Sequence, residues 1–142
     1  MWLYKEGNAY LDRVGKWIEG GQSGIIGKIL IAENSTSLNV KNTAAVSAYW
    51  FGGCCTSNKI DLTRYSKLYV DITVNSEVAV PTTLDISNNV YDNTGVSAIT
   101  TGISKGKNTL VLDISNINTS YHIRVIIQQS YEIDINKVWL EK

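Results

Sequence analysis

The chain is poor in several residue types that usually direct a fold or a reaction. Its 142 residues include one proline, one histidine and two cysteines, which are neighbours at Cys54 and Cys55. A disulfide between adjacent residues is strained, and no third cysteine offers a partner. We therefore expect two reduced thiols, at least one of them buried. Reduced thiols indicate folding in a reducing compartment.

An excess of charge and a long apolar run are also missing. The 13 basic residues balance the 13 acidic ones, so the formal net charge is zero. No basic field exists to attract nucleic acid or anionic lipid. No apolar run approaches the length of about 18 residues that a membrane-spanning helix needs. Met1 is followed by "WLYKEGN", which has no basic or apolar region of a signal peptide. We expect a soluble protein with neither nucleic acid nor membrane as a partner.

The segments that are present alternate between apolar and polar residues and are separated by turn residues. This period of two predicts strands. The length fits a single domain over residues 1–142. We expect eight or nine strands in an all-β, two-sheet antiparallel β-sandwich of jelly-roll type. A break in phase near Asn136 predicts a β-bulge. The clearest expected strands cover residues 24–32, 42–52, 67–74, 82–87, 96–103, 108–114, 122–129 and 133–142.

Residues 10–18 leave two alternatives open. Tyr10, Leu11, Val14, Trp17 and Ile18 fall on one helical face, which would suit a short helix or turn. A glycine at position 15 weakens a helix by about 1 kcal/mol relative to alanine. We favour a loop that enters a strand near position 17.

One phrase occurs twice, as "IDLTRYSKLY" from residue 60 and "LDISNINTSY" from residue 112. Asp61 and Asp113 can each accept hydrogen bonds from backbone N–H groups just downstream, which would cap a single turn. Tyr65 or Ile117 would then fold back as an apolar plug over the core. We expect the chain to cross between the two sheets at these corners. The alternative is a chance likeness between two turns that contain Asp.

Residues able to catalyse a reaction are scattered. His122 stands in an alternating strand, and neither Cys54 nor Cys55 has the surroundings of a cysteine-protease nucleophile. A glycosidase needs two carboxylates that flank one bond. The acidic residues lie mostly at turns or on polar strand faces, including Asp12, Glu19, Asp61, Asp71, Asp85 and Asp134. We expect no enzymatic activity and assign no catalytic residue.

A loop rich in oxygen ligands raises the question of a metal. The stretch "DISNNVYDNTG" contains Asp85, Asn88, Asn89, Asp92 and Asn93. Such side chains suit Ca²⁺, but their spacing does not match an EF-hand. We favour a plain hairpin loop, with a structural calcium ion as the alternative. No metal site or cofactor is assigned.

Aromatic residues give the best functional lead. Four tryptophans and eight tyrosines can stack on the apolar faces of sugars, while polar side chains bind the hydroxyls. In the stretch "AYWFGG", strand alternation points Tyr49 to one face and Trp50 to the other. Core packing and protein interfaces are the alternative roles for each tryptophan. We name Tyr49, Trp50, Tyr91 and Arg124 as candidate ligand-binding residues.

Three phrases carry a family resemblance. The stretches "IDLTRYSKLYVDI", "KGKNTLVLDISNINTSYHIRV" and "INKVWLEK" resemble jelly-roll domains of the galactose-binding-like and carbohydrate-binding-module type. The opening "LYKEGN" and the final "VWLE" resemble modules of clostridial and bacillar prophage structural and tail proteins. The resemblance implies a non-catalytic sandwich that attaches to glycans or to other parts of a virion. The sugar-contacting positions of such families are not fixed, so none is carried over.

These observations predict an attachment module of a phage or prophage particle, located in the virion and assembled in the host cytoplasm. Its partner would be a bacterial surface glycan. The alternative is a purely structural virion protein that contacts other virion proteins and forms a homo-oligomer. Glycan binding predicts a concave face with exposed rings, whereas assembly predicts a contiguous apolar patch. A hydrolytic enzyme is the least favoured function.

Overall fold

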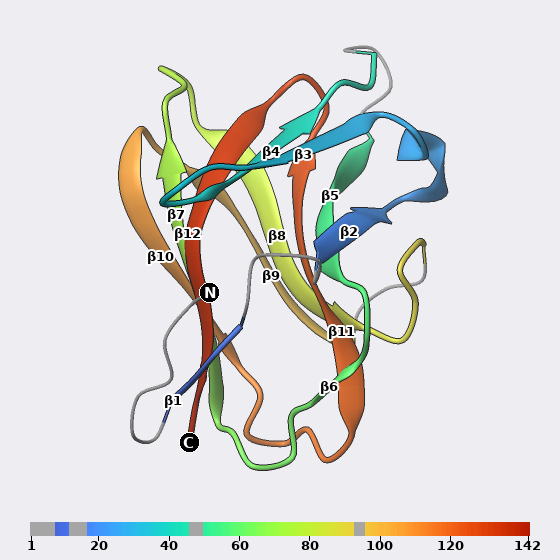
Figure 1. The fold of residues 1–142 in the computed structure, drawn as a ribbon, viewed down its shortest axis with the longest axis vertical. Coiled ribbons are helices and arrows are strands. Elements are labelled where there is room, and N and C mark those ends of the chain that lie inside the picture. Colours follow the sequence, from blue (N-terminus) through green and yellow to red (C-terminus); the bar gives the residue numbers. More distant parts are fainter. Residues whose placement is uncertain (1–7, 12–16, 46–49, 93–95) are drawn as a thin grey trace.

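A computed structural model of the chain describes residues 8–11, 17–45, 50–92 and 96–142. In these ranges the chain forms twelve strands and one short 3-10 helix. The strands make two antiparallel sheets that pack face to face (Figure 1). The predicted all-β sandwich is confirmed. The strand number exceeds the expected eight or nine because β1, β4 and β6 are short segments without a long alternating pattern.

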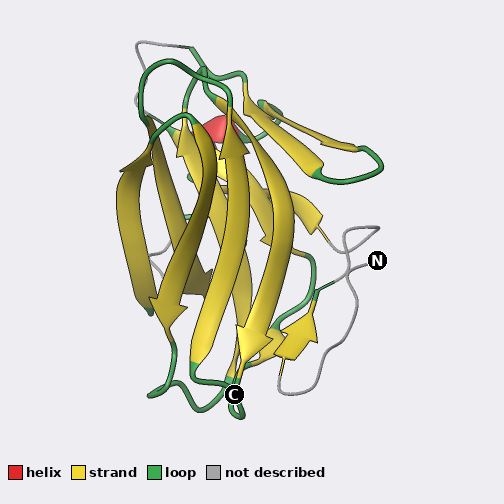
Figure 2. Ribbon diagram, turned by 90° about the vertical axis from the view of Figure 1, so that its left-hand side faces the viewer, coloured by secondary structure: helices red, strands yellow, loops and turns green. Residues whose placement is uncertain are grey.

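The first sheet, here called sheet A, holds the end of the sequence at its centre. Its strand order is β10-β7-β12-β4-β3, and β1 pairs with the end of β12. Figure 2 shows the long strands of this sheet in front, with their broad faces toward the viewer. The bounds are β1 (Asn8–Tyr10), β3 (Ile29–Glu33), β4 (Leu38–Asn42), β7 (Lys67–Val74), β10 (Gly106–Asp113) and β12 (Glu132–Glu141).

The second sheet, here called sheet B, is centred on β11. Its order is β2-β5-β11-β8-β9, with the short β6 also paired to β11. The 3-10 helix η1 (Ser23–Ile25) follows β2 and leads toward β3. The bounds are β2 (Trp17–Gly21), β5 (Phe51–Thr56), β6 (Ile60–Asp61), β8 (Val80–Ser87), β9 (Ser97–Ile103) and β11 (Ser120–Gln128).

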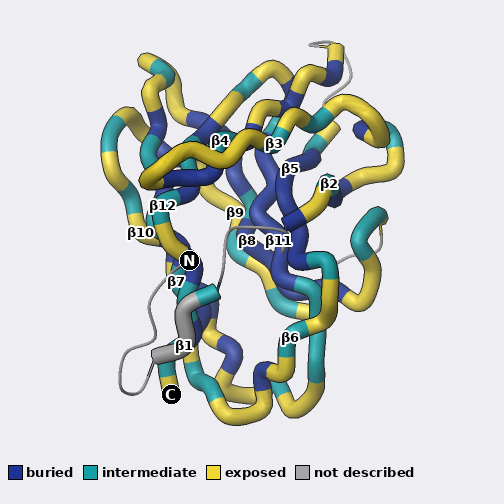
Figure 3. Tube along the Cα trace, in the orientation of Figure 1, coloured by how far each residue is buried: buried dark blue, intermediate teal, exposed yellow. Residues whose placement is uncertain are grey.

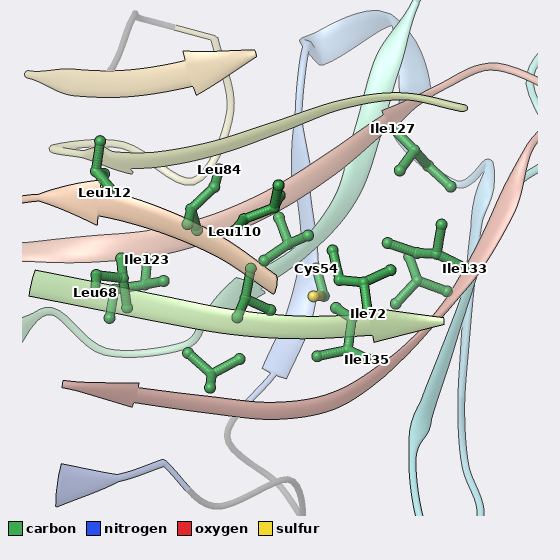
Figure 4. Close-up of a cluster of buried hydrophobic side chains, with 14 of the residues drawn as sticks. Cys54, Leu68, Ile72, Leu84, Leu110, Leu112, Ile123, Ile127, Ile133 and Ile135 are labelled. Atoms are coloured by element: carbon green, nitrogen blue, oxygen red, sulfur yellow. The ribbon is translucent and has the colours of Figure 1, made fainter. Parts of the chain in front are cut away.

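The core lies between the two sheets and follows the period-two pattern. In β7 every second residue, from Leu68 to Val74, is buried. Sheet B faces them with alternate residues of β11, among them Ile123 and Ile127 (Figure 4). Burial of each such side chain contributes roughly 1.5–3 kcal/mol. Buried residues recur along the strands of both sheets (Figure 3).

Both predicted corners are present. Asp61 Oδ1 accepts hydrogen bonds from the backbone N–H and the hydroxyl of Thr63, at 3.0 and 2.7 Å. Asp113 Oδ1 does the same with Ser115, at 2.9 and 2.7 Å. Each corner carries the chain from one sheet to the other, from β6 to β7 and from β10 to β11.

The apolar plugs of these corners are also as predicted. Tyr65 and Ile117 are partly buried and pack against the core cluster. The backbone N–H of each bonds back to the carbonyl three residues earlier, on Leu62 and Ile114 respectively. Leu62 and Ile114 are themselves fully buried. The repeated phrase therefore encodes the same corner twice.

The predicted bulge is confirmed in β12. The pairing of β12 with β7 shifts register between Ile135 and Lys137. Asn136 occupies the shift, and its Nδ2 donates to Thr73 Oγ1 at 2.9 Å. An extra residue in one strand explains the break in the apolar phase.

The strand predicted over residues 42–52 is wrong in its first part. β4 ends at Asn42, residues 43–45 lie outside strands, and β5 begins only at Phe51. The side chain of Asn42 explains the interruption. Its Oδ1 accepts from Ala44 N at 3.1 Å, while its Nδ2 donates to the carbonyls of Trp50 and Ile127. A side chain that bonds its own backbone two residues on favours a turn over a strand.

Two further boundaries differ from expectation. Residues 24–32 were expected to form one strand, but η1 and a turn at Gly27, with φ of +81°, precede β3. The favoured reading of residues 10–18 is confirmed where it is described, because a strand begins at Trp17. Residues 12–16 lie outside the described residues. Among those described, no helix has the length and apolarity to cross a membrane.

Candidate functional site

The outer face of sheet B is the candidate site, and β11 runs through its middle. The core contains Ile123, Val125 and Ile127, so their alternates Arg124 and Gln128 point to the outside of the sandwich. Register places Arg124 between Cys55 of β5 and Asp85 of β8.

Arg124 is covered although it lies on an outer face. Its side chain and that of Asp85 are 5% and 4% exposed, and they form a bidentate ion pair at 2.7 and 2.8 Å. Burial lowers the pKa of Arg124, but the hydrogen bonds and charge of Asp85 outweigh burial and raise it. The guanidinium of Arg124 therefore remains charged beneath the surface.

The cover over Arg124 is the loop between β8 and β9. Arg124 Nη1 donates to the carbonyls of Val90 and Asp92, at 3.1 and 3.3 Å. The same stretch continues to the edge strand β2, where Gly21 N donates to Val90 O and Asp92 N donates to Gly21 O. Asp92 Oδ1 accepts from Ser23 N at 2.7 Å. The loop is thus fixed at both the centre and the edge of sheet B.

Tyr91 sits at the point where this loop meets β2. Its hydroxyl donates to Glu19 Oε2 at 2.6 Å. Glu19 also accepts from the backbone N–H groups of Gly27 and Ile29. Burial, together with the hydrogen bond and charge of Glu19, raises the pKa of Tyr91 to about 12. Burial raises the pKa of Glu19, but the Tyr91 and backbone hydrogen bonds more than compensate and lower it.

Trp50 immediately precedes β5 and is 40% exposed. Its ring rests against Gly24, where a Cβ atom would come within 2.7 Å of the ring. Gly24 follows Ser23, whose N–H is bonded by Asp92. The structure therefore brings Trp50, Tyr91 and Arg124 to one region, with Arg124 supporting the loop that carries Tyr91. Tyr49 lies outside the described residues.

Sequence reasoning missed the polar part of this face. Thr83 and Thr100, on neighbouring strands, are joined by a 2.9 Å hydrogen bond between their hydroxyls. Gln128 is partly exposed and stands opposite the partly exposed Phe51. In the sequence, Thr83, Thr100 and Gln128 each lie next to an apolar residue of an alternating segment, and this alternation assigns them to the outer face. It does not show which residues of neighbouring strands lie beside them.

In the described part of residues 85–95, the two carboxylates have partners within the protein. The Asp85 carboxylate accepts hydrogen bonds from Arg124, and the Asp92 carboxylate accepts one from the backbone N–H of Ser23. No group of three His, Cys, Asp or Glu residues among those described could hold a metal ion. Asn93 lies outside the described residues.

The reactive residue types also have structural partners. Cys54 and Cys55 are both free and buried, as expected. Burial raises the pKa of both thiols, that of Cys55 to about 12 despite the nearby Arg124. His122 is partly buried, and its Nδ1 lies 2.8 Å from the carbonyl oxygen of Thr56, as in an N–H···O=C hydrogen bond. Because the raised pKa keeps the thiols of Cys54 and Cys55 protonated, both are poor nucleophiles near neutral pH.

Comparison with known proteins identifies the fold. No protein-family model matches the chain, and a comparison with curated proteins finds no match either. Among solved structures, a family 11 carbohydrate-binding module from Clostridium thermocellum is similar, with a TM-score of 0.66 and 13% identity over 95% of each chain. It was solved in complex with a β-1,3-1,4-mixed-linked tetrasaccharide.

Two other similar structures extend this comparison. A variant of a family 29 carbohydrate-binding module has a TM-score of 0.59 and 11% identity over 94% of this chain and 91% of that one. The Endo-D glycoside hydrolase domain from Streptococcus pneumoniae R6 has a TM-score of 0.59 and 14% identity, over 88% of this chain and 21% of that one. At these identities the likeness shows the fold: the chain is a β-sandwich of the kind found in carbohydrate-binding modules.

Proposed function

We propose that the chain is a non-catalytic glycan-binding module whose ligand lies on the outer face of sheet B. The observation that carries this proposal is that Trp50 and Tyr91 both lie near η1, beside an outer face that carries the Thr83 and Thr100 hydroxyls and the Gln128 amide. The shared fold with carbohydrate-binding modules, one of them in complex with a tetrasaccharide, supports it.

The chemistry of this face suits a saccharide. The exposed ring of Trp50 offers a flat apolar surface for the C–H face of a sugar. Thr83, Thr100 and Gln128 offer donors and acceptors for its hydroxyls. Arg124 acts as a positioning residue, because it holds the loop that carries Tyr91. A site fixed before binding loses less conformational entropy when the ligand arrives.

A finer assignment adds the biological setting. We propose that the ligand is a bacterial surface glycan and that the module belongs to a phage or prophage particle. This part rests on the resemblance of the opening "LYKEGN" and the final "VWLE" to prophage tail modules. The candidate ligand-contacting residues are Tyr49, Trp50 and Tyr91, and Arg124 is a positioning residue because its buried side chain is bonded to Asp85 and to the loop.

A second function is favoured by a separate observation. Ile26, next to η1, and Leu30, in β3, are each 58% exposed. Large apolar side chains at the surface suit a contact with another protein. We therefore keep a structural role, through subunit contacts in a homo-oligomer, as the alternative function.

A glycan array with the purified chain tests the proposal. We expect binding to at least one bacterial cell-wall polysaccharide, and we expect Trp50→Ala to weaken it about tenfold, equivalent to ~1.4 kcal/mol. Val78→Ala is the matched control, since Val78 is 58% exposed and lies outside this face, just before β8. Absence of glycan binding, together with a stable oligomer in solution, would favour the structural role instead.

A further inference from the structure

A depression lies on the opposite side of the sandwich, on the outer face of sheet A. The depression has a volume of about 490 Å³. Small-molecule sites typically measure roughly 300–1,000 Å³. Its lining includes Thr36, Asp71, Lys107, Thr109, Asn136 and Lys137. None of these residues belongs to the face of sheet B described above.

The bulge in β12 forms one wall of this depression. Asn136 is the extra residue, and its amide turns toward Thr73 of β7. After the bulge, Lys137 stands opposite Asp71, and Asp71 stands opposite Thr109 of β10. One row across three strands thus carries an ammonium, a carboxylate and a hydroxyl. Bulges often re-aim side chains next to binding sites.

The two lysines of the depression lack anionic partners. Lys107 and Lys137 are both exposed. Among the described residues the ion pairs are Lys105–Glu77 and Arg124–Asp85, so neither lysine is in one. The carboxylate of Asp71 accepts the Thr109 hydroxyl at 2.5 Å. The lining therefore holds two free cations and one carboxylate that is already hydrogen-bonded.

A pair of stacked aromatic rings lies beside the depression, outside its lining. Tyr69 and Trp139 stack with ring centroids 4.9 Å apart and planes 5° apart. Tyr69 lies two residues before Asp71 in β7, and Trp139 lies two residues after Lys137 in β12. Residues two apart in a strand point to the same face of the sheet. Both rings are only partly buried. A ligand that extends from the depression along β7 and β12 would therefore reach the aromatic pair as well as the charged groups.

From this arrangement we propose that the depression binds an acidic saccharide, a sugar that carries a carboxylate. The two lysines bind the carboxylate, Asn136 and Asp71 bind ring hydroxyls, and the Tyr69–Trp139 pair contacts the C–H face. A densely anionic ligand such as polyphosphate fits less well, because Asp71 would repel it. The proposal does not depend on the site on sheet B.

The test uses trigalacturonate as the probe and its fully methyl-esterified form as the neutral control of equal length. We expect trigalacturonate to shift the backbone amide signals of residues 107–109 and 136–139 in NMR spectra, and not those of residues 83, 100 and 128. The ester should bind at least tenfold more weakly in calorimetry. Esterification removes the charge on which the lysines act.

Charge-reversal variants complete the test. Lys107→Glu and Lys137→Glu should each weaken trigalacturonate binding at least tenfold. Lys59→Glu, at an exposed lysine between β5 and β6, should leave it unchanged. The NMR spectra themselves report whether each variant is folded. Equal binding of the ester, an equal effect of Lys59→Glu, or no shift at residues 107–109 and 136–139 would overturn the proposal.

Discussion

Arg124 and Asp85 form an ion pair that is held under a loop and away from water. Removal of one partner of such a pair leaves a buried charge without compensation, which typically costs about 3–5 kcal/mol. We expect Arg124→Met to lower the free energy of unfolding by this amount in urea titrations. The loop that carries Tyr91 should also lose its support, so glycan binding should weaken in the same variant.

The double variant Arg124→Met/Asp85→Leu separates the charge effect from the loss of packing. Replacement of both partners by apolar residues leaves no unpaired charge. We expect this variant to be clearly more stable than Arg124→Met alone. Equal stability of the single and double variants would show that the pair contributes through packing and not through charge.

Glu19 makes stability depend on pH. Its pKa is lowered from the ordinary value of 4.5 because the carboxylate accepts the Tyr91 hydroxyl and backbone N–H groups. A lowered folded-state pKa adds stability that is present in full above pH 4.5 and is lost as the pH falls through the folded-state pKa. The free energy of unfolding should therefore fall as the pH drops below 4.5 and through the lowered folded-state pKa of Glu19.

The variant Glu19→Gln isolates this contribution. Asp61 and Asp113 also have lowered pKa values, so the wild type combines several contributions of the same sign. We expect Glu19→Gln to be less stable than the wild type at pH 7 and to lose less stability on acidification. Parallel pH profiles for the two proteins, measured by urea unfolding, would contradict a role for the Glu19 carboxylate.

Among the larger elements, the two corners make matched test sites. Asp61→Ala and Asp113→Ala each remove an acceptor for a backbone N–H and a hydroxyl. We expect both variants to unfold at lower urea concentration, by similar amounts, because the two corners share one geometry. Asp113→Asn keeps a side-chain oxygen and should retain most of the midpoint. A large loss from one corner and none from the other would refute their equivalence.

Elements defined by local patterns were predictable from sequence, and those defined by distant contacts were not. The corners follow from side chains that bond two residues ahead, and the bulge follows from a phase break within β12. The interruption after β4 depends on Asn42, whose amide reaches the carbonyl of Ile127, 85 residues away. No local pattern shows that contact, so a strand was expected there.

At the scale of the whole molecule, some residues of the candidate site were predictable from sequence, and the contacts between distant strands were not. The composition pointed to Trp50 and Tyr91, and the structure places both beside η1. The burial of Arg124 was not predictable, because its partner Asp85 is 39 residues away in sequence. The depression on sheet A was missed for the same reason, since it joins residues of β7, β10 and β12.

The central place of β12 in sheet A has a consequence for synthesis on the ribosome. β7 and β4 are hydrogen-bonded to β12 and have no direct pairing with each other in the strand order. Half of the sandwich therefore stays open until residues 132–141 have emerged from the exit tunnel. Until then one edge of β7 lacks its hydrogen-bonding partner in the nascent chain, and unpaired strand edges favour aggregation.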